Sequence, residues 1–108
     1  MTNIYICGEH VKGTEEVNLE KIKNRFKTLK CSVINPNEIT NSKTNRLDNI
    51  GSRVKLLKKS KAIYVLPNWR ENTMARIELT VAMDLRLPML FHPVTNKEIK
   101  QLITTLDS

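Results

Sequence analysis

The stretch AIYVLPN, residues 62–68, carries the clearest strand signal in the chain. Five consecutive apolar residues are typical of a strand that is buried on both faces, and the Pro-Asn pair ends it. A helix is predicted over 73–85 with Asn72 as its N-cap, and Pro88 separates it from another apolar run over 89–91. A strand, a helix and a second strand in this order form the repeating unit of a parallel sheet.

The same alternation extends along the rest of the chain. Gly8 ends the first apolar run, Thr14 is predicted to cap the first helix, and Thr95 and Glu98 have the spacing of a capping box. The polar residues 36–48 predict no element. We expect strands over 4–7, 32–35, 62–66 and 89–91, and helices over 19–29, 50–60, 73–85 and 95–106. This order predicts an α/β fold: one domain over residues 1–108, with a four- or five-stranded parallel sheet and helices on both faces.

Composition narrows the class of protein. The 108 residues carry a net charge of +7, which attracts phosphates, nucleotides, nucleic acid or an acidic surface without choosing among them. No apolar run approaches the roughly 20 residues of a membrane span, and the N-terminus lacks a secretion signal. Cys7 and Cys31 form no C-x-x-C pair and have no nearby His, so we expect no metal site and a reduced, cytoplasmic protein.

Glu78 lies on the apolar side of the predicted helix over 73–85. A carboxylate there costs several kcal/mol unless it is paired or opens onto a polar cavity. One interpretation is a buried structural Glu, and the other is a nucleophile or base at the floor of a pocket. The residues three and four positions away are Met74, Ala75, Val81 and Ala82.

Arg53 raises the same question on the preceding helix, because its neighbours at helical spacing are Ile50, Leu56 and Leu57. Arg53 either neutralises Glu78 or binds a ligand phosphate. The spacing does not separate these two roles.

Ligands of parallel sheets bind beyond the carboxyl ends of the strands, which places residues 7–10 and 67–70 on one rim. Trp69 on this rim either stacks on a base or covers the core. No G-x-G-x-x-G follows the first strand, so no dinucleotide cofactor is expected. The loop after the first strand could hold a phosphate with its backbone N–H groups. Its candidate binding residues are Gly8, Glu9, His10 and Lys12.

Two stretches resemble the nucleoside 2-deoxyribosyltransferase superfamily, which includes the deoxynucleoside monophosphate N-glycosidases. The opening Ile4-Tyr5-Ile6-Cys7-Gly8 is similar to the first strand and loop of that superfamily. Residues 62–69, with Ala75-Arg76-Ile77-Glu78-Leu79 and Ala82, resemble the pattern A-I-Y-L-L-P-G-W followed by S-x-G-A-R-x-E-x-x-x-A of a small bacterial and phage branch. The resemblance spans nearly the whole chain and is specific from about residue 50 to 91.

This resemblance implies a Rossmann-like or flavodoxin-like domain that cleaves or transfers at the N-glycosidic bond of a nucleoside or nucleotide. It places the nucleophile on Glu78, which would attack C1 of the sugar. It also implies a homo-oligomer, a dimer or larger, whose pocket a neighbouring subunit completes. The implied phosphate or sugar contacts are residues 8–12 together with Asn72, Thr73 and Met74.

Three departures from the family pattern concern the chemistry. Asn72-Thr73-Met74 replaces S-x-G, so Met74 stands where a glycine would let a ligand approach the backbone. The family's second catalytic Asp falls on Arg53, and another frequent Asp falls on Lys61. Arg cannot shuttle a proton as Asp does, and a cation beside Glu78 is expected to lower its pKa and to make it a poorer nucleophile.

Three hypotheses follow from the sequence. The first is an N-glycosidic-bond hydrolase or deoxyribosyltransferase that acts through Glu78. The second is a protein that binds a nucleotide, or a signal derived from one, without turning it over. The third is a basic protein that binds nucleic acid or an acidic partner through the face over Lys55, Lys58, Lys59 and Lys61.

Overall fold

The computed structural model describes the chain except for residues 1, 9–18, 36–45, 68 and 108. The strands and helices follow the predicted alternation. In chain order they are β1 (Thr2–Cys7), α1 (Leu19–Thr28), β2 (Cys31–Ile34), α3 (Arg46–Lys58), β3 (Ala62–Val65), a 3-10 helix η1 (Trp69–Glu71), α4 (Thr73–Asp84), β4 (Met89–Phe91) and α5 (Asn96–Asp107).

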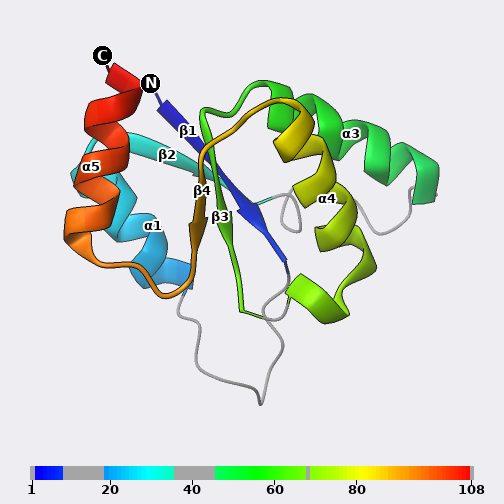
Figure 1. The fold of residues 1–108 in the computed structure, drawn as a ribbon, viewed down its shortest axis with the longest axis horizontal. Helices are drawn as coiled ribbons and strands as arrows, with labels where there is room; N and C mark the ends of the chain where they lie inside the picture. Colours follow the sequence, from blue (N-terminus) through cyan, green and yellow to red (C-terminus); the bar gives the residue numbers. More distant parts are fainter. Residues whose placement is uncertain (1, 9–18, 36–45, 68, 108) are drawn as a thin grey trace.

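The described strands form one four-stranded sheet in which every neighbouring pair is parallel, in the order β2-β1-β3-β4. Tyr5 in the central strand β1 lies opposite Ile34 of β2 and Ile63 of β3. The chain adds β2 on one side of β1 and then crosses to place β3 and β4 on the other side (Figure 1). The switch point of this Rossmann-like α/β sheet therefore lies between β1 and β3, where such sheets bind ligands.

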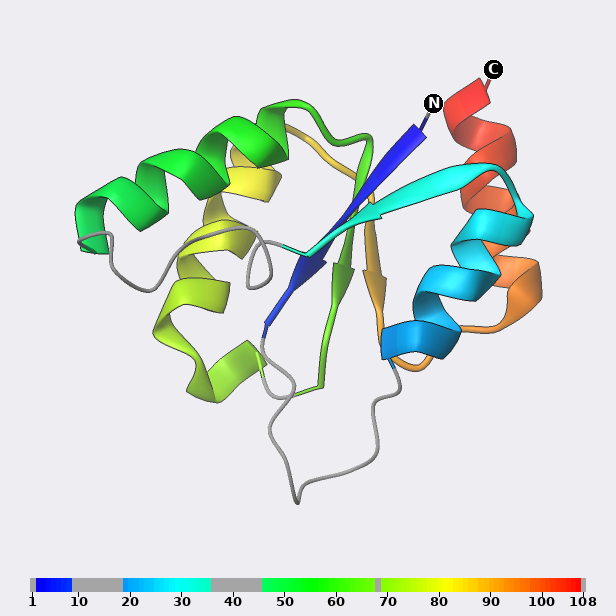
Figure 2. The ribbon, with the colours of Figure 1, turned by 180° about the vertical axis from the view of Figure 1, so that it is seen from behind.

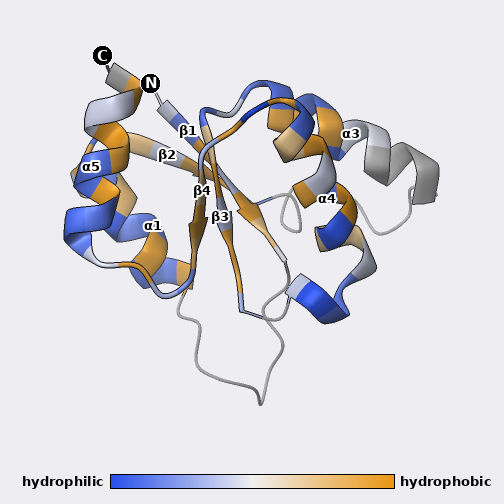
Figure 3. Cartoon of the chain, viewed as in Figure 1, coloured by the Kyte–Doolittle hydropathy of each residue, from blue (hydrophilic) through white to orange (hydrophobic). Residues whose placement is uncertain are grey.

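Helices cover both faces of the sheet, as the sequence predicts. Figures 1 and 2 show α1 and α5 on one face and α3 and α4 on the other. Alternation along β1 divides its side chains between two cores: Ile4 and Ile6 join the α1 and α5 side, whereas Tyr5 and Cys7 join the α3 and α4 side. Figure 3 shows the resulting apolar strands between the helical layers.

Polar side chains fix where two of the helices begin. The Asn72 Oδ1 atom accepts a hydrogen bond from the Ala75 amide at 3.0 Å, which confirms the predicted N-cap of α4. The Glu98 amide donates to Thr95 Oγ1 at 3.1 Å, and the Thr95 amide donates to Glu98 Oε1 at 3.3 Å. This reciprocal pair is the predicted capping box of α5. Because the Asn72 cap sets the start of α4, it also sets Glu78 in the second turn.

Most predicted boundaries differ from the structure by one or two residues, and the start of α3 differs by four. α3 begins at Arg46 rather than at residue 50, because three of its first four residues are polar and Leu47 alone extends the apolar period of the helix. β2 spans Cys31–Ile34 and ends one residue before the predicted 35. Asn35 is buried but lies after the strand, so burial alone does not extend the ladder.

Candidate functional site

The carboxyl ends of β1 and β3 meet at the switch point of the sheet. The Leu66 amide donates to the Cys7 carbonyl at 2.9 Å, so Gly8 and Pro67 leave adjacent strands at the same edge. Gly8 has a φ of 106°, a backbone conformation that glycine adopts at little cost. The predicted common rim is confirmed for these residues. Glu9, His10, Lys12 and Asn68 lie outside the described residues.

Glu78 is the buried carboxylate of this region, with 2% of its surface exposed. It enters the core from α4 among Ala75, Leu79 and Ala82, which pack against the sheet. Its Oε2 atom accepts hydrogen bonds from the Tyr5 hydroxyl and from Arg53 Nη1, the latter at 3.2 Å. The predicted place of Glu78 on the core-facing side of its helix is therefore confirmed.

Arg53 on α3 is the partner of Glu78. Its side chain is 11% exposed and forms a salt bridge with the carboxylate, with Nη1 and Oε2 3.2 Å apart. The guanidinium compensates part of the cost of burying the negative charge, and the two groups together add no net charge to the interior. This salt bridge corresponds to the first of the two roles that the sequence left open for Arg53, the neutralisation of Glu78.

Tyr5 and Cys7 complete the surroundings of the carboxylate. The Cys7 sulfur lies 4.0 Å from Glu78 Oε1 and 3.4 Å from the Ala75 carbonyl oxygen, so β1 contacts the first turns of α4 directly. Burial, and then the negative charge of Glu78, raise the pKa of the Tyr5 hydroxyl and of the Cys7 thiol far above their usual values. Both groups stay protonated at neutral pH, and Tyr5 therefore remains a hydrogen-bond donor to Glu78.

Sequence reasoning missed the roles of Tyr5 and Cys7, because both belong to an uninterrupted apolar run that resembles plain core. The signal that could have found them is the two-residue period of a strand, which sends positions 5 and 7 to one face. The apolar face of α4 packs on that same face of the sheet. A polar hydroxyl at position 5 is the group that can satisfy Glu78 there.

The other predicted binding residues lie at the same edge with different exposure. Asn72 caps α4, Thr73 is exposed, and Met74 is half-buried in the first turn. Trp69 in η1 packs partly against the core of the α3 and α4 side, and Arg70 stacks over its ring at 5.3 Å from the centroid. Trp69 therefore covers part of the core, and part of its ring remains accessible.

The remaining polar side chains of the described residues are weaker candidates for a site. The His92 ring and the Tyr64 hydroxyl form a 2.5 Å hydrogen bond. The basic face is exposed at all four lysines, Lys55, Lys58, Lys59 and Lys61. In the part of the chain that the structure describes, no three His, Cys, Asp or Glu side chains come together as a metal site would require.

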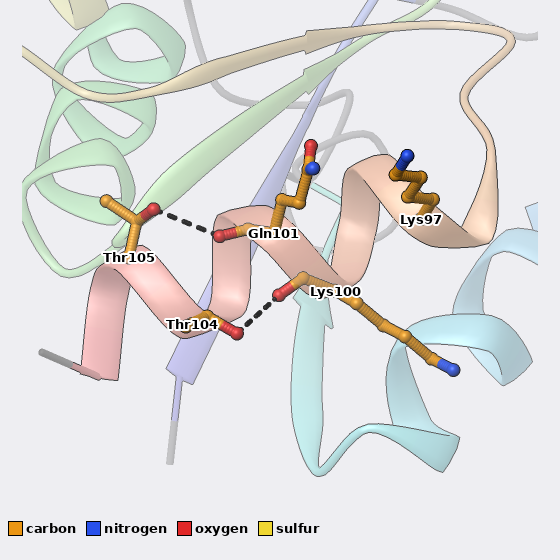
Figure 4. Close-up of a pocket in the computed structure, with 5 residues that line it drawn as sticks. All are labelled: Lys97, Lys100, Gln101, Thr104 and Thr105. Atoms are coloured by element: carbon orange, nitrogen blue, oxygen red, sulfur yellow. Dashed lines mark hydrogen bonds between the residues drawn. The ribbon is translucent and has the colours of Figure 1, made fainter.

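A hollow on α5 is also a poor candidate. Figure 4 shows its five lining residues on one helix alone, and the Thr104 and Thr105 hydroxyls donate to the backbone carbonyls of Lys100 and Gln101. A single helix cannot surround a ligand, and these hydroxyls already have partners.

Among the described helices, none is long and apolar enough to cross a membrane.

A family model described as "Domain of unknown function (DUF4406)" matches residues 2–91 of the chain. The chain belongs to the DUF4406 family. The DUF4406 match runs from β1 to the last residue of β4, so it contains Tyr5, Arg53 and Glu78, whereas α5 follows the matched stretch. The comparisons found no match to the chain among curated proteins and none among solved structures.

The buried ion pair predicts a strong energetic coupling between α3 and α4. Glu78→Gln or Arg53→Met alone removes one charge and leaves the other buried, and each should lower the free energy of unfolding by about 3 kcal/mol. The double variant should lose less than the sum by about 1–3 kcal/mol. Urea denaturation of the four proteins measures this cycle, with the exposed Lys55→Met as a control that should change stability by less than about 0.5 kcal/mol. Additive losses would show that the pair is not coupled.

The two tyrosines of the chain, Tyr5 and Tyr64, predict an unusual alkaline titration. Burial raises the pKa of both hydroxyls above the usual 10.0. Their contribution to stability is therefore complete below pH 10 and is lost as the pH rises further, because the unfolded chain releases these protons more readily. In an alkaline titration, near-ultraviolet absorbance should detect tyrosinate only at the pH values at which circular dichroism shows that the protein unfolds. Tyrosinate that forms reversibly near pH 10 in a folded protein would contradict the buried positions.

Proposed function

We propose that this protein binds a nucleoside or nucleotide at the carboxyl edge of β1 and β3, and that Glu78 acts on the N-glycosidic bond. The observation that carries the proposal is a buried carboxylate held by the Tyr5 hydroxyl and Arg53 beside the switch point of the sheet. Ligands of open α/β sheets bind at this point. The resemblance to the nucleoside 2-deoxyribosyltransferase superfamily, which puts its nucleophile at the same position, supports the same conclusion.

The chemistry that we propose is a double displacement at C1 of the sugar. A carboxylate oxygen of Glu78 forms a bond to C1 while the bond from C1 to the base nitrogen breaks, and the electron pair leaves with the base, which takes a proton from water. Water, or a second base, then attacks C1 and releases the carboxylate. Oε2 accepts hydrogen bonds from Tyr5 and Arg53, and Oε1 accepts a weaker one from the Cys7 thiol at 4.0 Å, so we assign the attack to Oε1.

The edge also offers features that suit the rest of the ligand. The first turn of α4 presents backbone amides at the positive end of a twelve-residue helix, beside the end of β1. The chain's net charge of +7 favours an anionic ligand. Gly8, Thr73 and Met74 are the described residues proposed to contact sugar or phosphate. We also propose that the protein is a homo-oligomer and acts in the cytoplasm.

A second candidate is a binding protein without turnover, and the salt bridge between Arg53 and Glu78 favours it. The guanidinium takes up negative charge on the carboxylate, which lowers its tendency to attack carbon. Arg53 also stands where the superfamily's pattern has an acid that could handle a proton. In this case the same edge binds the ligand, but the glycosidic bond stays intact.

Base release separates the two candidates. Purified protein is incubated with deoxynucleosides, ribonucleosides and their monophosphates, and free base is followed by chromatography. Under the first proposal Glu78→Gln should lower the rate of base release at least about a thousandfold. Tyr5→Phe removes one hydrogen bond to a charged group and should lower the rate about ten- to a hundredfold.

Two further variants make this test specific. Glu78→Asp keeps the charge beside Arg53 but withdraws the oxygen by one methylene, so it should fold and still lose activity. Asp84→Asn removes an exposed carboxylate from the same helix and should leave the rate unchanged. Unchanged base release in Glu78→Gln would overturn Glu78 as the nucleophile, and a thermal shift with no base release in the unaltered protein would favour the second candidate.

A further inference from the structure

A second feature of the carboxyl edge is a hollow between the ends of β3 and β4. It has a volume of about 580 Å³, with η1 as one wall and the end of β4 as the other, and Leu66 and Pro67 belong to its lining. This volume falls within the range of small-molecule sites, roughly 300–1,000 Å³. The Glu78 side chain is not part of its lining, so the hollow is a separate feature.

Planar groups dominate its walls. The rings of Trp69 and Phe91 both line it and contact each other, with centroids 6.2 Å apart and an angle of 56° between their planes. The Arg70 guanidinium, another planar group, stacks over the Trp69 ring. Phe91 is 48% exposed, although it is one of the largest apolar side chains of the sheet. An exposed aromatic ring beside a second one in a concave site is typical of a binding surface rather than of a core.

Phe91 in the wall of the hollow lies on the same side of the sheet as Glu78. Met89 packs into the core of the α3 and α4 side and Leu90 into the opposite core, so alternation returns Phe91 to the α4 side. Tyr5 and Cys7, which contact Glu78, face that side from β1. β1, β3 and β4 are successive neighbours about 4.8 Å apart. A ligand of two or three linked rings can therefore extend from above β1 to the hollow.

We infer that this hollow, called the notch below, binds the heteroaromatic base of the ligand by stacking on the exposed face of Phe91 beside Trp69. Stacking on aromatic and guanidinium planes is how proteins commonly hold an unpaired base. The exposed Arg70 and Glu71 line the same notch and supply a hydrogen-bond donor and an acceptor for the ring edge. His92, fixed by its hydrogen bond to Tyr64, lines the other wall. The identity of the ring as a nucleobase rests on the proposed function, whereas the notch rests on the geometry alone.

Trp69 makes this inference directly measurable, because it is the only Trp in the chain. Its fluorescence is titrated with free adenine, cytosine and thymine, and with 2-deoxyribose as a probe that lacks the ring. At least one base should quench saturably, and deoxyribose should not. N-acetyltryptophanamide under the same conditions corrects for quenching in solution.

Two variants locate the site. Phe91→Leu keeps an apolar side chain but removes the ring, and it should weaken binding of the quenching base about tenfold. Arg70→Ala removes an exposed guanidinium, which folding does not require, and should weaken it about threefold. Met83→Leu changes an exposed apolar residue near the far end of α4 and should have no effect.

The outcomes separate this inference from the proposed function. Saturable quenching that Phe91→Leu and Arg70→Ala weaken supports the notch, and it should persist in Glu78→Asp whether or not the protein releases base from nucleosides. The notch would be overturned if none of the three bases quenched saturably. It would also be overturned if both notch variants bound the base as tightly as the unaltered protein. Base release with an unchanged KM in Phe91→Leu would overturn the notch and leave the role of Glu78 intact.

Discussion

The structure depends on how one buried negative charge is accommodated. Glu78 brings a carboxylate into the core of the α3 and α4 side, where it is 2% exposed, and the Tyr5 hydroxyl and Arg53 converge on one of its oxygens. These partners come from β1 and α3, so a single carboxylate connects the central strand with both helices of that face. A buried charge without such partners would cost several kcal/mol, a large part of the stability of a domain this small.

The same contacts restrict the chemistry that the site can perform. The Tyr5 hydroxyl holds the orientation of the carboxylate and stays protonated at neutral pH, because burial and the charge of Glu78 raise its pKa. Arg53 stabilises the charge but also weakens its attack on carbon. A nucleophile in this setting depends on strong activation of the substrate, and a base held by stacking in the Trp69 and Phe91 notch would restrict the positions that the sugar can take.

Much of the fold could be predicted because short apolar strands and helical periodicity alternate without interruption. The N-cap at Asn72 and the capping box at Thr95 and Glu98 have local signatures, and the apolar neighbours of Glu78 marked it as buried. The first turn of α3 was missed because Leu47 is its one apolar residue. The contact of Tyr5 with Glu78 joins residues 73 positions apart, and the notch joins η1 to the end of β4. Such pairings depend on strand order, which local patterns do not encode.

The proposed role of Glu78 as a nucleophile is tested most directly by trapping a covalent intermediate on it. A nucleoside that carries fluorine at the 2-position of an arabino sugar slows both displacement steps, because the fluorine destabilises the positive charge that develops near C1. We expect mass spectrometry to show the protein heavier by one fluorinated sugar, with the adduct on the peptide that contains Glu78. A nucleoside that is cleaved while the sugar bonds to another residue, or to none, would contradict the account.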